Sequence, residues 1–238
     1  MLSLKPAAYG LKTSSGLLEG NRQGKESREM IRNIKVLGLA LVAVLAMSAV
    51  ASAGASAATN FVAATSTASV TADQVASENH IFTVDGAEVK CKTAHFETAG
   101  EVASPASSIT VHPTYGECTA FGFVGASVNT TGCDYKLFAS GAINVVCSGT
   151  NQIIITAATC EAKVPAQEIA SGVTYKNQAT SPTTVLVEAG LTNSIKTTKT
   201  KDGLLCPLNG TGSANGSYAG DTVAKGFNKG SQVNIKVE

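Results

Sequence analysis

The stretch HIFTVDGAEVKCK, residues 80–92, predicts a tight β-hairpin. Two runs rich in β-branched and aromatic residues, 80–84 and 87–92, flank the dipeptide Asp85-Gly86. A two-residue primed turn needs positive φ at both central positions, which Asp and Gly adopt more readily than most residues. We therefore expect two antiparallel strands that are joined at Asp85 and Gly86.

Similar short strands, separated by turn residues, are expected from this hairpin to residue 237. Their spacing of roughly eight to twelve residues is typical of an antiparallel β-sandwich or barrel-like fold. No stretch after residue 60 combines helical periodicity with caps over three turns, and the best exception, 165–170, would make one or two turns at most. The other expected strands are 108–112 (ended by Pro113), 115–121, 126–129, 133–138, 142–147, 152–156, 159–164, 173–175, 183–187, 194–198, 217–219, 221–227 and 232–237.

A basic, an apolar and a small-residue region follow one another ahead of these strands, and this order predicts a helical secretory signal peptide over residues 30–57. Arg28, Arg32 and Lys35 precede an uncharged apolar run over 36–47, and overlapping A-x-A cleavage sites lie within 51–57. The alternative is an uncleaved membrane anchor, because residues 36–55 have no charge and are long enough to span a bilayer.

The chain is expected to divide into four parts. Residues 1–29 are a disordered or mis-assigned extension, since a segment of ordinary signal-peptide proportions begins at Met30. The signal peptide follows at 30–57. Residues 58–78, rich in Ala, Thr and Ser, are expected to form a linker, or alternatively an edge strand. Residues 79–238 form the all-β domain outside the cytoplasm.

Six cysteines, all beyond the signal segment, predict three disulfides of an exported protein. No two are close enough for the C-x-x-C spacing that is typical of zinc sites. The number of cysteines leaves fifteen possible connectivities. Because two pairs flank expected turns, the pairing that we expect is Cys118–Cys133 and Cys147–Cys160, with Cys91–Cys206 remaining.

No catalytic or metal-binding motif stands out, and we expect no catalytic residue, no metal ion and no cofactor. The motifs G-x-S-x-G, H-E-x-x-H and H-x-H do not occur. His80, His95 and His112 are candidate general bases, but a lone histidine on a strand is more often a surface or cross-strand residue. Tryptophan, a common sugar platform, is missing; the tyrosines that could replace it are Tyr115, Tyr135, Tyr175 and Tyr218.

The charge distribution weighs against nucleic acid and membrane surfaces as partners. Up to residue 57 the chain has seven Lys or Arg and three Glu, whereas from residue 58 it has eleven Lys, fourteen Asp or Glu and no Arg. Nucleic-acid binding needs a clustered basic face, and an anionic membrane attracts polybasic segments. A slightly acidic domain without arginine fits neither, so only the signal segment, if uncleaved, is expected to contact a membrane.

The sequence around the cysteines resembles a group of uncharacterised exported proteins of soil actinobacteria. The resemblance rests on residues 89–96 (VKCKTAHF), 115–122 (YGECTAFG), 132–135 (GCDY) and 155–160 (ITAATC), and it would cover most of 80–238. It implies an extracellular compartment and no particular chemistry.

The function expected from the sequence is that of an exported, non-enzymatic structural or binding module at or beyond the cell envelope, with an unknown extracellular partner. One alternative is a secreted hydrolase that uses an unrecognised carboxylate and histidine site. The other is an inhibitor of extracellular enzymes, held rigid by disulfides. A pocket in which histidines and carboxylates converge would favour the hydrolase, and a protruding loop anchored by a disulfide would favour the inhibitor.

Overall fold

The computed structural model describes residues 58–201 and 206–238. These residues form β-strands and no helix, which confirms the predicted all-β, disulfide-bonded fold. The expected extension and signal peptide, 1–29 and 30–57, lie outside the described residues. Within the described ranges, no helix is long and apolar enough to cross a bilayer. The strands are β1 (Phe61–Ala63), β2 (Thr67–Gln74), β3 (His80–Val84), β4 (Ala87–Glu97), β5 (Val102–Ala103), β6 (Ser108–Ala120), β7 (Val124–Asn129), β8 (Cys133–Phe138), β9 (Ile143–Cys147), β10 (Ile153–Ala157), β11 (Cys160–Val164), β12 (Gln167–Ile169), β13 (Val173–Gln178), β14 (Thr184–Lys201), β15 (Gly212–Asn228), β16 (Ser231–Val233) and β17 (Ile235–Val237).

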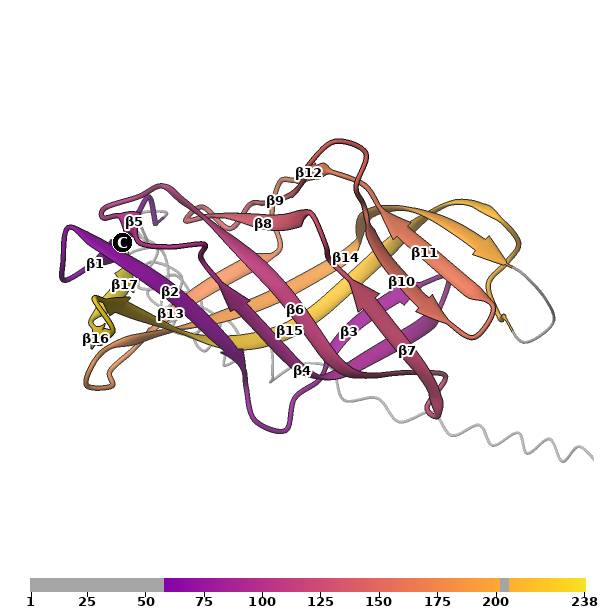
Figure 1. Cartoon of the computed structure of the whole chain (residues 1–238), viewed down its shortest axis with the longest axis horizontal. Helices are drawn as coiled ribbons and strands as arrows, with labels where there is room; N and C mark the ends of the chain where they lie inside the picture. Colours follow the sequence, from indigo (N-terminus) through magenta and orange to yellow (C-terminus); the bar gives the residue numbers. More distant parts are fainter. Residues whose placement is uncertain (1–57, 202–205) are drawn as a thin grey trace, which may run out of the picture. The chain divides into compact units, whose positions relative to one another are not determined.

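The strands form a closed, barrel-like ring of antiparallel pairs (Figure 1). Hydrogen bonds join β4 to β6, and then β7, β10, β11, β14, β15 and β3, which returns to β4. The β3–β4 turn lies at one end of this ring, which we call the turn end. The short strands β1 and β17 lie at the other, which we call the cap end. Inward-facing residues of the ring make up the apolar core.

The predicted hairpin is confirmed as β3 and β4, with Val84 opposite Ala87. Asp85 has φ 51° and Gly86 has φ 78°, so both central residues take the positive φ that a primed two-residue turn requires. Alternate residues of β3, from His80 to Phe82 and Val84, are buried, while Ile81 and Thr83 are partly exposed. This period of two places His80 on the inner face of the ring.

Three strands each join two strands that the sequence predicts separately, because residues that usually end strands lie within them. The expected strands 108–112 and 115–121 are the single strand β6, which runs through Pro113. The Pro113 carbonyl accepts a 2.6 Å hydrogen bond from the Thr130 hydroxyl, so its nitrogen also faces away from β4. At that point neither β8 nor β7 pairs with β6, and proline removes no ladder hydrogen bond there.

Strands β14 and β15 each join two expected strands in the same way. The expected strands 183–187 and 194–198 lie in β14, where the register shifts between Leu191 and Ile195. The expected strands 217–219 and 221–227 lie in β15, which Gly220 does not interrupt. A register irregularity absorbs the extra residues of β14 without ending the strand.

Two further segments form strands. The expected linker over 58–78 contains β1 and β2, and β2 is not an edge strand, because it pairs with both β15 and β4. Small residues allow this, since Ala68 and Ala72 are buried on the same face of β2. The segment 165–170, the best exception to the expected absence of helix, contains β12, which pairs with β9 and buries Ile169. A three-residue strand buries that side chain without the cost of starting a helix.

Side-chain amides replace strand partners at two edges of the sheet. The Gln167 amide accepts from the Lys196 N–H at 2.8 Å and donates to the Lys196 carbonyl at 3.0 Å. Asn177 accepts from the Val237 N–H at 2.8 Å and donates to the Val237 carbonyl at 2.9 Å. Each amide thus copies the donor and acceptor of a backbone unit. These contacts connect β12 to β14 and β13 to β17.

The cap end is covered by β1 and β17, which pair with each other. Phe61 exchanges two backbone hydrogen bonds with Ala106, at 2.7 and 2.9 Å. The Ala63 N–H donates to the Ser104 hydroxyl at 2.7 Å. With the Asn177 contact, β1 and β17 are therefore connected to β13 on one side and to the β5–β6 segment on the other.

The predicted set of three disulfides is present, but the expected pairing Cys91–Cys206, Cys118–Cys133 and Cys147–Cys160 is wrong. The expected pairing assumed hairpins between β6 and β8 and between β9 and β11, but these strands do not pair in that way around the cysteines. β4 pairs with β6 and β8 with β9, and each pair places two cysteines in register at Cα separations of 3.9 and 4.0 Å. The observed disulfides are Cys91–Cys118, Cys133–Cys147 and Cys160–Cys206.

Candidate functional site

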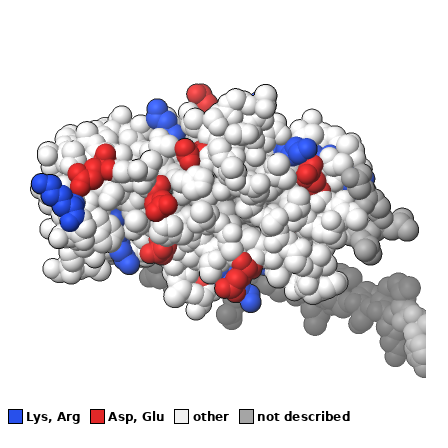
Figure 2. Space-filling view, viewed as in Figure 1, with Lys and Arg blue, Asp and Glu red and all other residues white. Residues whose placement is uncertain are grey.

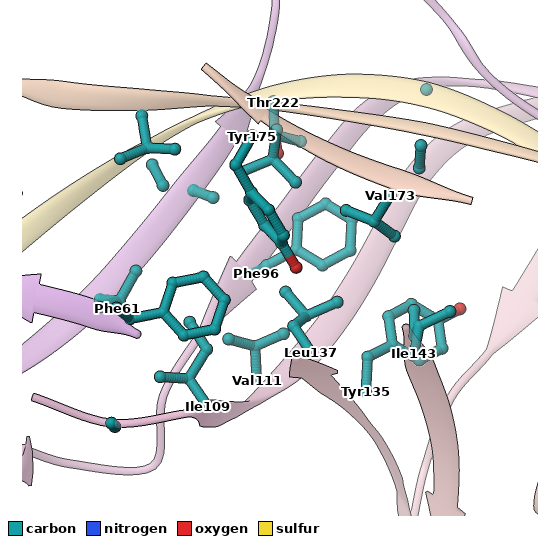
Figure 3. A pocket seen from close by; sticks show the side chains of 18 of the residues that line it. Phe61, Phe96, Ile109, Val111, Tyr135, Leu137, Ile143, Val173, Tyr175 and Thr222 are labelled. Atoms are coloured by element: carbon teal, nitrogen blue, oxygen red, sulfur yellow. The ribbon is translucent and has the colours of Figure 1, made fainter. Parts of the chain in front are cut away.

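An apolar cavity of about 120 Å³ lies inside the domain and extends toward the cap end, and it is lined both by strands of the ring and by strands beside the ring, such as β1, β8 and β13. Figure 3 shows side chains from several strands pointing into one space. Among them are Phe61 of β1, Phe96 of β4, Leu137 of β8 and Tyr175 of β13. Most lining residues are Ala, Val, Ile, Leu or Phe. Ligand sites in proteins are concave and mostly apolar, with a few placed polar groups, so this cavity is the candidate site.

A row of polar aromatic groups lies inside the ring and reaches the cavity. The His80 Nδ1 lies 2.5 Å from the Tyr218 hydroxyl. The Tyr218 hydroxyl is 3.1 Å from that of Tyr115, which is 3.2 Å from that of Tyr135. His80, Tyr135 and Tyr218 line the cavity. We call these four residues the His–Tyr chain.

Sheet register explains why residues so distant in sequence meet. β3 lies between β15 and β4, and Tyr218 is the cross-strand partner of Phe82, two residues from His80. Gly220 follows on the same face of β15, and a Cβ there would lie 2.4 Å from the His80 Nδ1. Any larger residue at position 220 would therefore displace the imidazole, so glycine makes room for His80.

Aromatic rings pack around the His–Tyr chain and exclude water from it. Phe82 lies 5.0 Å from Tyr115 and 4.9 Å from Tyr218, between ring centroids. Phe96 lies 5.8 Å from His80 and meets the Tyr115 ring edge-on at 5.9 Å. Such edge and tilted arrangements are favourable for aromatic pairs.

Burial shifts the pKa values of the groups in the His–Tyr chain. It lowers the pKa of His80 to about 4, with a smaller opposite effect from the Asp221 backbone. It raises the pKa of Tyr135 to about 12, and it holds the pKa values of Tyr115 and Tyr218 well above their usual range. At neutral pH the His–Tyr chain is therefore uncharged, with a neutral imidazole and protonated phenols.

The cap end of the cavity is bordered by two aromatic side chains. The rings of Phe61 and Tyr175 meet edge-on at 5.1 Å between centroids. The Tyr175 hydroxyl donates to the Phe138 carbonyl at 3.0 Å, which holds this ring in place. Burial raises the pKa of Tyr175 well above its usual range. Of the four candidate tyrosines, Tyr115, Tyr135 and Tyr218 therefore belong to the His–Tyr chain, and Tyr175 lies at the cap end of the cavity.

The three candidate histidines are not brought together. His80 is 1% exposed inside the ring. His95 lies on the outer face, with its Nδ1 2.7 Å from an Asp73 carboxylate oxygen and its Nε2 3.8 Å from a Glu97 oxygen. His112 is also partly exposed, 2.9 Å from Asp134. Among the described residues, no hydroxyl is hydrogen-bonded to the imidazole ring of His95 or His112, so these pairs lack the nucleophile of a hydrolytic triad.

The outer surface shows no concentration of one charge on the face in Figure 2. Side chains of both signs are scattered over it, and most of the visible surface is uncharged. Several charges pair with a neighbour on the same or the next strand, such as Lys90 with Glu88 at 3.0 Å and Lys163 with Glu161 at 2.9 Å. Within 58–201 and 206–238, no group of three or more His, Cys, Asp or Glu is arranged to hold a metal ion.

Sequence reasoning found the members of the site but not the site itself. His80 alternates with Phe82 and Val84 in an apolar strand pattern, and this was the available signal that its imidazole faces inward. That Tyr115, Tyr135 and Tyr218 meet it depends on which strands are neighbours in the ring. No family model matches this chain, and neither a curated protein nor a solved structure does.

Proposed function

We propose that this chain is an exported, non-enzymatic binding module that holds a small apolar molecule inside its barrel-like domain. The observation that supports this most directly is the cavity, whose lining is almost entirely apolar and includes Phe61, Phe96 and Tyr175. An apolar molecule gains free energy by leaving water for such a space, at about 25 cal/mol per Å² of surface that is buried. His80 is the histidine that lines this cavity, whereas His95 and His112 pair with carboxylates elsewhere, and this separation favours binding over hydrolysis.

Binding is tested by calorimetry with a branched C6 alkene, 2-methyl-1-pentene, on the chain with its disulfides formed. We expect saturable binding to one site. Ala224 of β15 is buried and lines the cavity, so Ala224→Leu places three more carbons there and should weaken binding at least tenfold. Ala219 of the same strand is exposed, and Ala219→Leu is the matched control that should bind normally. Equal binding by the two variants would contradict the proposal.

Export is tested separately by the intact mass of protein secreted from a bacterial host, with and without reduction. The three disulfides support an oxidising compartment, since such bonds are rare in the cytosol. We expect a mass that begins near residue 58 and six thiols that label only after reduction. A chain that stays in the cytoplasm with free thiols would contradict export. The binding proposal would then be decided by the calorimetry alone.

A further inference from the structure

We propose that the ligand is a neutral molecule that presents one hydrogen-bond acceptor, such as a ketone or ester carbonyl, to the Nε2–H group of His80. This inference rests on the proposed function and adds the chemical class of the ligand. His80 lines the cavity and is 1% exposed. Its Nε2 has no hydrogen-bond partner among the described residues. A buried polar atom without a partner is costly, and a ligand atom at this position would remove that cost.

The direction of the His–Tyr chain assigns a proton to Nε2. Each phenol has one proton to donate. The Tyr115 hydroxyl faces the hydroxyls of Tyr135 and Tyr218 as the donor. The Tyr218 hydroxyl therefore accepts from Tyr115, and its own proton has the His80 Nδ1 as its partner. The neutral imidazole then has its proton on Nε2.

The opposite tautomer, with the proton on Nδ1, leaves one more buried group without a partner. Nδ1 would then donate to the Tyr218 hydroxyl, which already accepts from Tyr115, and no other described residue accepts the Tyr218 proton. The Tyr218 proton and the Nε2 lone pair would both lack partners, whereas the first tautomer leaves only the Nε2–H group without one. The Nε2 atom is therefore a donor, and its partner must be an acceptor.

The cations near the cavity and the cavity volume further restrict which ligands can bind. The lysine that lines the cavity, Lys236, is paired with Glu238, and the buried Lys199 is paired with Asp85. An anionic ligand would therefore enter an apolar space without a free cation among these groups, at a large desolvation cost. A cavity of about 120 Å³ is somewhat smaller than the ~150 Å³ that holds benzene in an engineered core, so a ligand of roughly six heavy atoms fits.

The test compares two ligands of the same shape, 2-pentanone and 2-methyl-1-pentene, in which a carbonyl oxygen replaces a CH₂ group. Calorimetry gives the ratio of their dissociation constants in the wild-type chain and in His80→Phe. We expect the variant to lose about tenfold in ketone affinity relative to alkene affinity, the size of one net hydrogen bond. His95→Phe, the same change on the outer face, should leave the ratio within twofold of wild type.

A second measurement needs no variant, in case His80→Phe fails to fold. Nitrogen-15 NMR of the wild-type imidazole should show the Nε2–H tautomer, with an Nε2 resonance that shifts when 2-pentanone binds and not when the alkene binds. An Nδ1–H tautomer, or the same ratio of ketone to alkene dissociation constants in wild type and His80→Phe, would overturn this inference. Alkene binding would in that case still support the proposed function. If neither compound bound, the proposed function would fail as well.

Discussion

The imidazole of His80 has a pKa of about 4, against 6.5 for an exposed histidine, because burial disfavours its charged form. The unfolded chain therefore binds more protons than the folded chain between roughly pH 4 and pH 6.5. In this window the stability contributed by His80 rises with pH, and it is lost as the pH falls. A difference of this size corresponds to about 3 kcal/mol.

Urea unfolding of the wild-type chain and of His80→Phe at pH 7.5 and pH 4 measures this contribution. The stability of the wild type relative to the variant should fall by about 3 kcal/mol between the two pH values. Carboxyl groups with shifted pKa values, such as those of Glu101 and Asp221, titrate in both chains and cancel in the comparison. A stability difference that does not depend on pH would mean that His80 is hydrated in the folded chain.

Asp85 has two roles that a single substitution can separate. Its backbone takes a positive φ in the β3–β4 turn, and its carboxylate pairs with Lys199, whose side chain is 7% exposed. Asp85→Asn keeps a residue that tolerates this backbone and removes the charge. We expect a loss of about 3 kcal/mol in urea unfolding, because an uncompensated buried cation remains.

The double variant Asp85→Asn with Lys199→Met is the control for this prediction. Removing both charges should recover most of the lost stability, since replacing a buried ion pair by apolar groups is often nearly neutral. A double variant as unstable as Asp85→Asn alone would show that the turn, and not the ion pair, was damaged.

At the scale of strands, the Gln167 amide is expected to protect part of β14. It is the partner of both backbone groups of Lys196, just beyond the register shift that ends at Ile195. Gln167→Ala should speed amide hydrogen exchange at Lys196 by about tenfold and leave exchange at Leu186, on the other side of the shift, unchanged. Uniform acceleration over both positions would indicate global destabilisation, and no change at Lys196 would contradict the bridging role.

Strands with local sequence signals could be predicted, whereas strands that depend on contacts with distant parts of the sequence could not. The β3–β4 hairpin and β8 were predictable, because the turn dipeptide Asp85-Gly86 and the run 133–138 are local signals. The prediction that a strand ends at Pro113 was wrong, since whether a proline interrupts a strand depends on which neighbours the strand has at that point. The lead-in strand β2 was missed for the same reason, because Ala68 and Ala72 have little propensity of their own and are ordered by β15 and β4.

At the scale of the whole domain, the disulfide pairing and the cavity were beyond sequence reasoning. An even cysteine count predicts three bonds, but the partner of Cys91 is determined by the β4–β6 register and not by sequence spacing. The cavity likewise exists because the ring closes and places inward-facing side chains of many strands around one space. The composition gave a partial hint, since a core rich in Ala and Val with few aromatic residues fills a ring poorly.

The central claim, an apolar space open to a small ligand inside the ring, is tested most directly by a crystal structure under xenon pressure. Dry apolar cavities of this size bind xenon. We expect xenon density among Phe96, Val111, Leu137 and Tyr175, with little movement of these side chains. An interior without xenon, in which the lining side chains pack against one another, would contradict the account.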